Sequence, residues 1–200
     1  MKQFFYKGYV FNISDLVYMP SDDTILLAKY LKVYPGEIIL DMGTGCGVLA
    51  ILAAEKARKV VGVDINPHAI ICATKNVELN AVDVRKIVFR QGDLFEPIST
   101  DEKFNLIIFN SPYLPVEETK EGWLEKAWSG GINGRGVIDR FISAAPNYLK
   151  ENGRILLLQS TLSDVNKTVE NLRKLKLNVR VIAEEKLEFE TLVLILAKKT

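Results

Sequence analysis

The sequence predicts an α/β fold: a mostly parallel sheet of seven strands, with helices on both faces, that ends in an antiparallel hairpin. Short apolar runs alternate with helix-like stretches along the chain, which is typical of parallel sheets. The runs ILDM, VVGV, LIIF and ILLL are continuous, as expected of strands buried on both faces. The last two apolar runs are separated by too few residues for a crossover helix, so they should pair antiparallel.

Local signals give the elements in chain order. The expected strands are Glu37–Met42, Lys59–Val63, Lys86–Arg90, Phe104–Asn110, Arg154–Gln159, Val179–Ala183 and Leu192–Ala197. The first expected helix is rich in alanine and leucine, and the second opens with a proline, which is favoured at the first helical position. The expected helices are Val48–Ala57, Pro67–Leu79, Gly136–Leu149 and Ser163–Leu175.

Length and composition favour one domain that spans residues 1–200. Of the 200 residues 48% are hydrophobic, and the formal net charge of +1 lacks the basic excess that nucleic-acid binding usually leaves. Two cysteines and one histidine are too few for a disulfide framework or a four-ligand zinc site, so we expect no metal. We expect a cytoplasmic protein with no membrane partner, because the sequence shows neither a signal-peptide pattern nor a run of about 18 apolar residues.

A glycine-rich loop, DMGTGCG at residues 41–47, follows the first expected strand and leads into a helix. Glycines let a backbone turn tightly near a ligand, and a helix start offers free N–H groups. A dinucleotide site has the spacing G-x-G-x-x-G, but here the third glycine comes one residue early and Val48 takes its place. The pattern resembles the first motif of S-adenosylmethionine enzymes. The resemblance implies that cofactor, with contacts from Asp41, Gly43, Thr44, Gly45 and Gly47.

The next two strands end in acidic residues. Asp64 ends the second strand, 21 residues beyond Gly43, and its two carboxylate oxygens can accept both ribose hydroxyl hydrogens. The resemblance to S-adenosylmethionine enzymes also implies that Asp93 accepts a hydrogen bond from the adenine amino group. It implies that Leu94 or Ile65 lies against the adenine ring. Three such elements at three successive strand ends predict one cofactor site.

The fourth strand runs into Asn110-Ser-Pro-Tyr113, where open α/β sheets bind ligands. The Asn110 side chain and the Ser111 carbonyl offer two acceptors, and Ser111 is held extended because it precedes Pro112. Tyr113 offers an aromatic wall. Two acceptors suit an –NH2 group on a planar system, whose nitrogen they would aim at the methyl group of the cofactor. We therefore predict Asn110, Ser111, Pro112 and Tyr113 as catalytic residues, with Asn110 also beside the cofactor, and expect positioning to carry much of the catalysis.

These motifs resemble those of the HemK/PrmC glutamine methyltransferases, which modify the Gly-Gly-Gln loop of peptide release factors. The resemblance implies the Rossmann-like class I methyltransferase fold. The resemblance is greatest to the short archaeal and eukaryotic branch, which lacks an extra N-terminal helical domain. The first glycine of the glycine-rich loop is already residue 43, so we expect no such domain here. That branch usually has Asn-Pro-Pro-Tyr, so Ser111 keeps a carbonyl but loses the fixed φ of proline.

Two further segments carry the resemblance. VYMPSDDTILL, residues 17–27, matches a stretch before the cofactor loop of that branch. This implies that Asp23 and Thr24 lie near the methionine end of the cofactor, and that residues 1–35 form an extension packed on the cofactor site. WSGGINGR, residues 128–135, matches the glycine-rich segment after the catalytic turn.

The resemblance implies N5-methylation of the release-factor glutamine, with the release factor as partner and a small zinc-containing activator as another. Two alternatives stay open: methylation of a nucleic-acid amino group (adenine N6 or guanine N2), and methylation of a protein lysine. The near-neutral charge and single-domain length disfavour nucleic acid as a direct substrate. The long connection Leu114–Gly134 is expected to border the substrate cleft and to be mobile.

Overall fold

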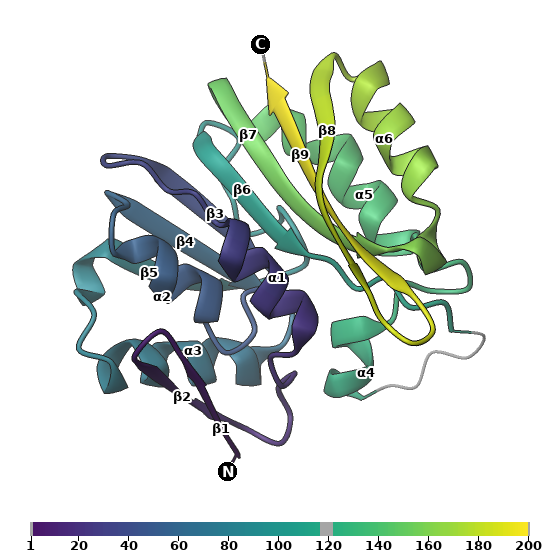
Figure 1. Ribbon diagram of the computed structural model, residues 1–200. Coiled ribbons are helices and arrows are strands. Elements are labelled where there is room, and N and C mark those ends of the chain that lie inside the picture. Colours follow the sequence, from purple (N-terminus) through teal and green to yellow (C-terminus); the bar gives the residue numbers. More distant parts are fainter. Residues whose placement is uncertain (1, 117–121, 200) are drawn as a thin grey trace. The chain divides into compact units, whose positions relative to one another are not determined.

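The computed structural model describes residues 2–116 and 122–199, which form two compact units, Met1–Ser99 and Thr100–Thr200 (Figure 1). The first unit holds a hairpin, three helices and three parallel strands in the order β5-β4-β3. Its elements are β1 (Lys2–Tyr6), β2 (Tyr9–Ile13), α1 (Asp22–Tyr30), β3 (Ile38–Met42), α2 (Val48–Ala54), β4 (Lys59–Asp64), α3 (Pro67–Leu79), a 3-10 turn (Val84–Lys86) and β5 (Ile87–Gln91).

Parallel pairing brings the ends of these three strands to one edge. β3 pairs with β4 up to Met42↔Val63, and β4 pairs with β5 up to Asp64↔Gln91. The loops that follow β3, β4 and β5 therefore start side by side. Because the glycine-rich loop, Asp64 and the Asp93 segment each follow one of these strands, the register places these three predicted elements at the same edge of the first unit.

The N-terminal hairpin packs along α3, as Figure 1 shows. The Asn76 side chain of α3 accepts a hydrogen bond from the Asn12 N–H at 2.9 Å and donates to the Asn12 carbonyl at 3.1 Å. Asn80, one turn further along, makes the same pair of bonds with Val10, at 2.9 and 2.7 Å. Two asparagine amides thus act as an extra strand edge for β2. We did not predict this hairpin from the sequence.

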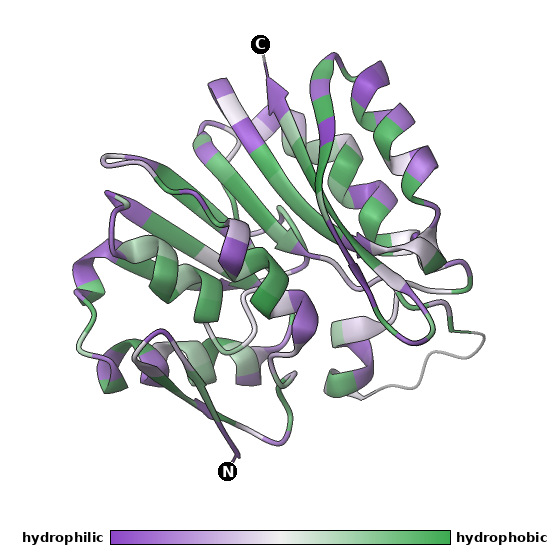
Figure 2. Cartoon of the chain, viewed as in Figure 1, coloured by the Kyte–Doolittle hydropathy of each residue, from purple (hydrophilic) through white to green (hydrophobic). Residues whose placement is uncertain are grey.

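In its described residues the second unit holds four strands in the order β6-β7-β9-β8, with β6 and β7 parallel and the last two pairs antiparallel. Figure 2 shows β6 and β7 as mainly hydrophobic, whereas α6 carries hydrophilic residues along much of its length. The elements are β6 (Phe104–Asn110), α4 (Trp123–Trp128), α5 (Gly136–Ala144), a 3-10 turn (Ala145–Tyr148), β7 (Leu149–Ser160), a 3-10 turn (Thr161–Ser163), α6 (Val165–Lys174), β8 (Leu177–Lys186) and β9 (Thr191–Lys199).

Helix α5 covers the parallel strands of this unit with an apolar face. Ile138, Phe141 and Ile142 are buried at helical spacing. The ring of Phe141 lies 4.5 Å from that of Phe109 on β6, centroid to centroid. Aromatic pairs at this separation stabilise a core beyond the area they bury, so the pair fixes α5 beside the strand that ends at Asn110.

The predicted fold class is confirmed, with parallel strands in both units and a closing antiparallel hairpin. Strand Phe104–Asn110 and helix Pro67–Leu79 have the predicted bounds. The predicted helix Gly136–Leu149 is wrong in its last turn, because Pro146 lacks an N–H and the chain there forms a 3-10 turn before β7. Within the described residues, no helix has the length and apolar character to cross a membrane.

Candidate functional site

The cofactor loop, Asp41–Gly47, joins β3 to α2 through three glycines with positive φ, 66° at Gly43, 55° at Gly45 and 89° at Gly47. Residues with a side chain rarely adopt such angles. A Cβ on Gly47 would lie 3.1 Å from the Cβ of Ala73, because the loop packs closely on α3. The third glycine is therefore required where it stands, one residue earlier than in a dinucleotide loop.

Asp41, the first residue of this loop, stabilises it through a buried hydrogen bond to Thr44. It is 1% exposed, and its Oδ2 accepts a hydrogen bond from the Thr44 hydroxyl at 2.7 Å. Its Oδ1 is buried and accepts no hydrogen bond of ordinary geometry, although the Ala50 N–H is near enough to favour the charged form slightly. Burial raises the pKa of Asp41 to about 7; the Thr44 bond opposes this, and the nearby charge of Asp64 adds to it.

Asp64 is anchored at the end of β4 by two backbone donors. Its Oδ2 accepts from the Gly45 N–H at 2.8 Å, and its Oδ1 from the Asn66 N–H at 2.9 Å. Burial raises the pKa of Asp64, and the N–H groups of Asn66, Gly45 and Ile65 oppose that rise. Each carboxylate oxygen has a second lone pair. The carboxylate is thus oriented in advance and can still accept two ribose hydroxyls.

The third element lies beside the second. The Gly92 N–H donates to the Asp64 carbonyl at 3.0 Å, which joins the loop after β5 to the end of β4. Asp93 and Leu94 follow directly and are half-buried, and Leu94 has a φ of 50°. Ile65 is 40% exposed. The structure therefore gathers the cofactor loop, the Asp64 end and the Asp93 loop at one edge, as predicted from their order in the sequence.

Asp23 and Thr24 lie in the first turn of α1, a helix that packs on α2. Both are buried, at 6% and 7% exposure. Asp23 accepts hydrogen bonds from the Tyr18 hydroxyl at 3.0 Å and the Thr24 hydroxyl at 3.1 Å. Buried carboxylates are costly unless they are hydrogen-bonded, and the Tyr18 and Thr24 hydroxyls supply those bonds here.

The Asn110–Tyr113 segment, here called the NSPY turn, leaves β6 in the second unit. Asn110 is in register with Leu158 of β7. The buried Ser111 donates to the Leu158 carbonyl twice, from its hydroxyl at 2.7 Å and from its N–H at 3.3 Å. Proline in this position has no donor. Ser111 thus fastens the turn to β7 by two hydrogen bonds that a proline could not donate.

The connection after this turn has more structure than a plain loop. It contains the short helix α4, and Leu114 forms a parallel bridge with Ser129. Residues 117–121 of the predicted mobile segment lie outside the described residues. Its place beside a substrate cleft stays a prediction.

Two asparagines that brace the predicted site were not singled out from the sequence. Asn66 precedes Pro67 and caps α3 by accepting from the His68 N–H at 2.9 Å, and its amide donates to the Leu16 carbonyl at 2.7 Å. The Asn-Pro pair is a recognisable helix start and could have signalled this cap. Asn76, which also donates to the Cys46 carbonyl of the cofactor loop at 2.9 Å, gives no such signal.

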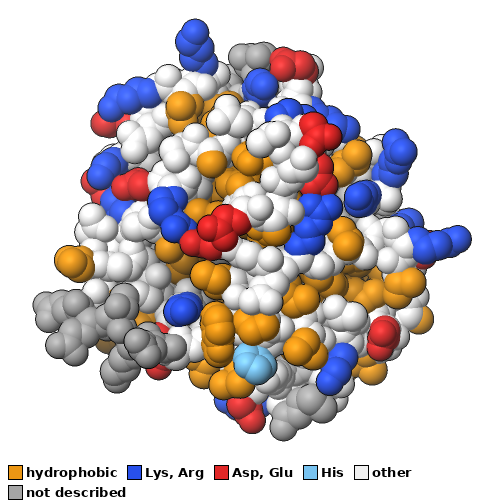
Figure 3. All heavy atoms as spheres, turned by 180° about the vertical axis from the view of Figure 1, so that it is seen from behind, with side chains coloured by type: hydrophobic (Ala, Val, Ile, Leu, Met, Phe, Trp, Pro, Cys, Tyr) orange, Lys and Arg blue, Asp and Glu red, His pale blue; other side chains and the backbone are white. Residues whose placement is uncertain are grey.

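The single histidine reaches the surface, as Figure 3 shows, and on that face basic and acidic side chains are interspersed. Within residues 2–116 and 122–199, no group of three or more His, Cys, Asp or Glu side chains could hold a metal ion. Cys46 is buried, and burial raises the pKa of its thiol far above the usual range. A thiol kept protonated in this way is a poor nucleophile.

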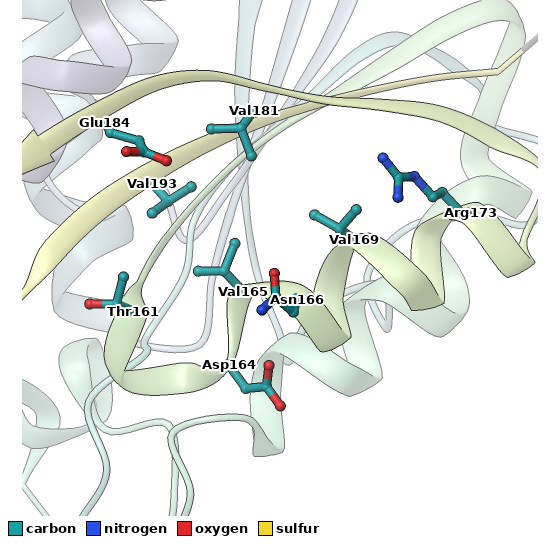
Figure 4. Close-up of a pocket in the computed structure, with 9 residues that line it drawn as sticks. All are labelled: Thr161, Asp164, Val165, Asn166, Val169, Arg173, Val181, Glu184 and Val193. Atoms are coloured by element: carbon teal, nitrogen blue, oxygen red, sulfur yellow. The ribbon is translucent and has the colours of Figure 1, made fainter.

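A hollow of about 520 Å³ opens elsewhere in the second unit, between α6 and the β8–β9 hairpin (Figure 4). Four valines and several polar residues line it: Thr161, Asp164, Val165, Asn166, Val169, Arg173, Val181, Glu184 and Val193. No predicted site residue is among them, so the hollow has no part in the predicted site.

Comparison with known proteins shows the family to which this chain belongs. The family model described as the methyltransferase small domain matches residues 21–191. A provisionally named protein N5-glutamine methyltransferase of Methanocaldococcus jannaschii is 40% identical over 94% of this chain and 95% of its own. The human methyltransferase HEMK2 is 35% identical over 71% of each chain.

A solved structure agrees at the level of the fold. The E. cuniculi Mtq2–Trm112 complex, responsible for methylation of the eRF1 translation termination factor, matches with a TM-score of 0.69 at 24% identity. The match covers 92% of this chain and 99% of that one. The chain belongs to the methyltransferase small domain family, in the branch of the protein N5-glutamine methyltransferases, a family that uses S-adenosylmethionine.

Proposed function

We propose that the protein transfers the methyl group of S-adenosylmethionine to the side-chain amide nitrogen of the glutamine in the Gly-Gly-Gln loop of a peptide release factor. The observation that carries this proposal is the NSPY turn at the end of β6, fastened to β7 by Ser111, in a chain that belongs to the glutamine methyltransferases. The relative that methylates a termination factor supports the choice of substrate. With that substrate, the protein would work in the cytoplasm.

In this proposal the first unit holds the cofactor. The carboxylate of Asp64 accepts the ribose hydroxyls, and its orientation is fixed by the Gly45 and Asn66 N–H groups. Asp93 accepts from the adenine amino group, with Leu94 or Ile65 against the ring. The glycines of the cofactor loop admit the methionine end close to the backbone, near the Asp23 cluster. Asp41 and Thr44 contribute by holding the loop in shape.

The NSPY turn holds the acceptor. The amide nitrogen of glutamine is a weak nucleophile because its lone pair is delocalised. Hydrogen bonds from the substrate –NH2 to the Asn110 side chain and the Ser111 carbonyl would orient that lone pair, while Tyr113 packs on the planar amide. Such orientation can lower a barrier by roughly 7–11 kcal/mol in favourable cases. The bound cofactor supplies the electrophilic methyl group, and the amide proton leaves to solvent after transfer.

A small activator subunit is part of the proposal. The Mtq2 relative was solved together with Trm112, and we propose that a subunit of that kind joins this chain. Methyl transfer should therefore be measured with and without such a subunit.

The test is methyl transfer from labelled cofactor to purified acceptors. The arms are release factor, the same factor with its loop glutamine changed to alanine, histone, and structured RNA. We expect label only on the intact release factor. Label on histone lysine or on RNA alone would replace the proposed substrate with one of the alternatives.

Asn110→Ala should remove turnover while the dissociation constant of the cofactor, measured by calorimetry, stays within about threefold of wild type. The loss should reach at least about 100-fold, because a misplaced acceptor costs roughly that much. Asn147→Ala, at an exposed asparagine of the same unit, is the matched control and should retain wild-type turnover. Full activity of Asn110→Ala would remove this residue from the mechanism.

A further inference from the structure

The segment that follows the NSPY turn is paired with a second glycine-rich loop. The Leu114 N–H donates to the Trp128 carbonyl at 2.9 Å, and the Gly130 N–H donates to the Leu114 carbonyl at 2.9 Å. The Val116 N–H then donates to the Gly131 carbonyl at 3.0 Å. We name residues Gly130–Arg135 the clamp loop, because its backbone is hydrogen-bonded to Leu114 and Val116, which follow Tyr113.

The clamp loop closes on Tyr113 through Gly134. Gly134 has a φ of 69°, and a Cβ built on it would lie 2.2 Å from the Tyr113 carbonyl oxygen. Gly131 has a similar φ of 81°, but a Cβ there would meet nothing within 4 Å. Both positions require left-handed backbone, and only Gly134 also requires the absence of a side chain. The loop thus touches the backbone of the predicted catalytic turn at one glycine.

A buried arginine anchors the end of this loop. Arg135 is 3% exposed, and the two N–H bonds of its Nη1 are shared among three acceptors, the carbonyls of Ser163 and Asp164 and the Thr168 hydroxyl. Its Nη2 donates to the Asp139 carboxylate at 2.6 Å. A buried charge is stable only when it is paired and hydrogen-bonded. The planar guanidinium meets four acceptors on α5, α6 and the turn before α6, an arrangement that a lysine ammonium cannot reproduce.

We infer that Arg135 and Gly134 are positioning residues for methyl transfer, an inference that rests on the proposed function. Arg135 locks the clamp loop to the helices of the second unit, and the loop, through Gly134, fixes the Tyr113 carbonyl. Ser111 fastens the other end of the same turn to β7. The NSPY turn is therefore held at both ends by residues of the second unit.

The two glycines give a matched pair of variants. Gly134→Ala and Gly131→Ala both place an alanine in left-handed backbone, so both carry the same conformational strain. Only the Gly134 methyl group pushes against Tyr113. We expect Gly134→Ala to lower kcat by about 100-fold, in line with a misplacement of about 1 Å, and Gly131→Ala to lower it by less than about fivefold. The dissociation constant of the cofactor should stay within about twofold in both.

Arg135 is tested separately, which guards against a glycine variant that fails to fold. Arg135→Ala should lose kcat with unchanged cofactor affinity, and added guanidinium ions at low concentration should restore part of it. Arg135→Lys should stay impaired. Arg140→Ala, at an exposed arginine of α5, the helix that follows Arg135, should behave as wild type.

Wild-type turnover on the release factor tests the proposed function, and the ratios between variants test the positioning inference. Equal losses in the two glycine variants, or a fall in cofactor affinity that matches the fall in kcat, would overturn the inference and leave the function intact. Arg135→Ala with wild-type kcat would overturn it as well.

Discussion

The buried carboxyl of Asp41 makes the stability of the protein depend on pH near neutrality. Its pKa is raised from 3.8 to about 7, mainly by burial. Each pKa unit corresponds to about 1.36 kcal/mol. The rise in the pKa of Asp41 of about three units therefore changes the free energy of unfolding by about 4 kcal/mol over the full pH range between the two pKa values. Between these two pH values the folded protein holds the proton and the unfolded chain has lost it. The free energy of unfolding therefore falls as pH rises through this window, and the neutral carboxyl is the stabilising form.

Asp41→Asn removes this titration and keeps an acceptor for the Thr44 hydroxyl. Wild type should lose about 3 kcal/mol relative to the variant between pH 5 and pH 8, because about two pKa units of this window lie below the folded pKa. Any fixed effect of the new amide group, such as an unsatisfied N–H, is the same at every pH and does not alter the slope. The free energy of unfolding of Asp41→Asn, relative to that of wild type, should therefore be higher at pH 8 than at pH 5.

The assay is urea denaturation of the protein without cofactor at four values of pH from 5 to 8. The measured quantity is the difference in unfolding free energy between variant and wild type, so groups common to both cancel. Asp15→Asn, at an exposed aspartate of the same unit, controls for the loss of one surface carboxylate. A difference between Asp41→Asn and wild type that stays constant over this range would refute the reasoning.

Substitutions at Asp64 and Ser111 test the anchors of the site. Asp64→Asn leaves one acceptor oxygen for two backbone N–H groups, so cofactor affinity in a calorimetric titration should fall at least about tenfold, with Asp15→Asn unchanged; equal affinity would exclude Asp64 from the cofactor site. Ser111→Ala should lower the free energy of unfolding by roughly 1 kcal/mol and Ser111→Pro by more, because proline removes both donors to Leu158. Ser143→Ala, at an exposed serine that also bonds a carbonyl, is the control, and a Ser111→Pro variant as stable as wild type would contradict the anchoring role.

Local signals in the sequence determined the elements that need only their own residues. Phe104–Asn110 is a continuous apolar run, and Pro67–Leu79 begins with a proline, so both were predicted with their observed bounds. Parallel strands end at one edge, and this general rule was enough to bring the cofactor loop, Asp64 and Asp93 together. The order of motifs along the chain therefore carried most of the predicted cofactor site.

Tertiary structure alone decided the contacts between distant residues. Asn76 holds Asn12, 64 positions away, and Ser111 binds the carbonyl of Leu158, 47 positions away. In the sequence Arg135 is indistinguishable from a surface arginine. Only the folded chain brings the carbonyls of residues 163 and 164 within hydrogen-bonding distance of it. Such bonds have no periodicity or spacing in the sequence, because each depends on where the rest of the chain packs. The sequence thus determined which residues stand at the strand ends, and folding decided which buried polar groups hold them there.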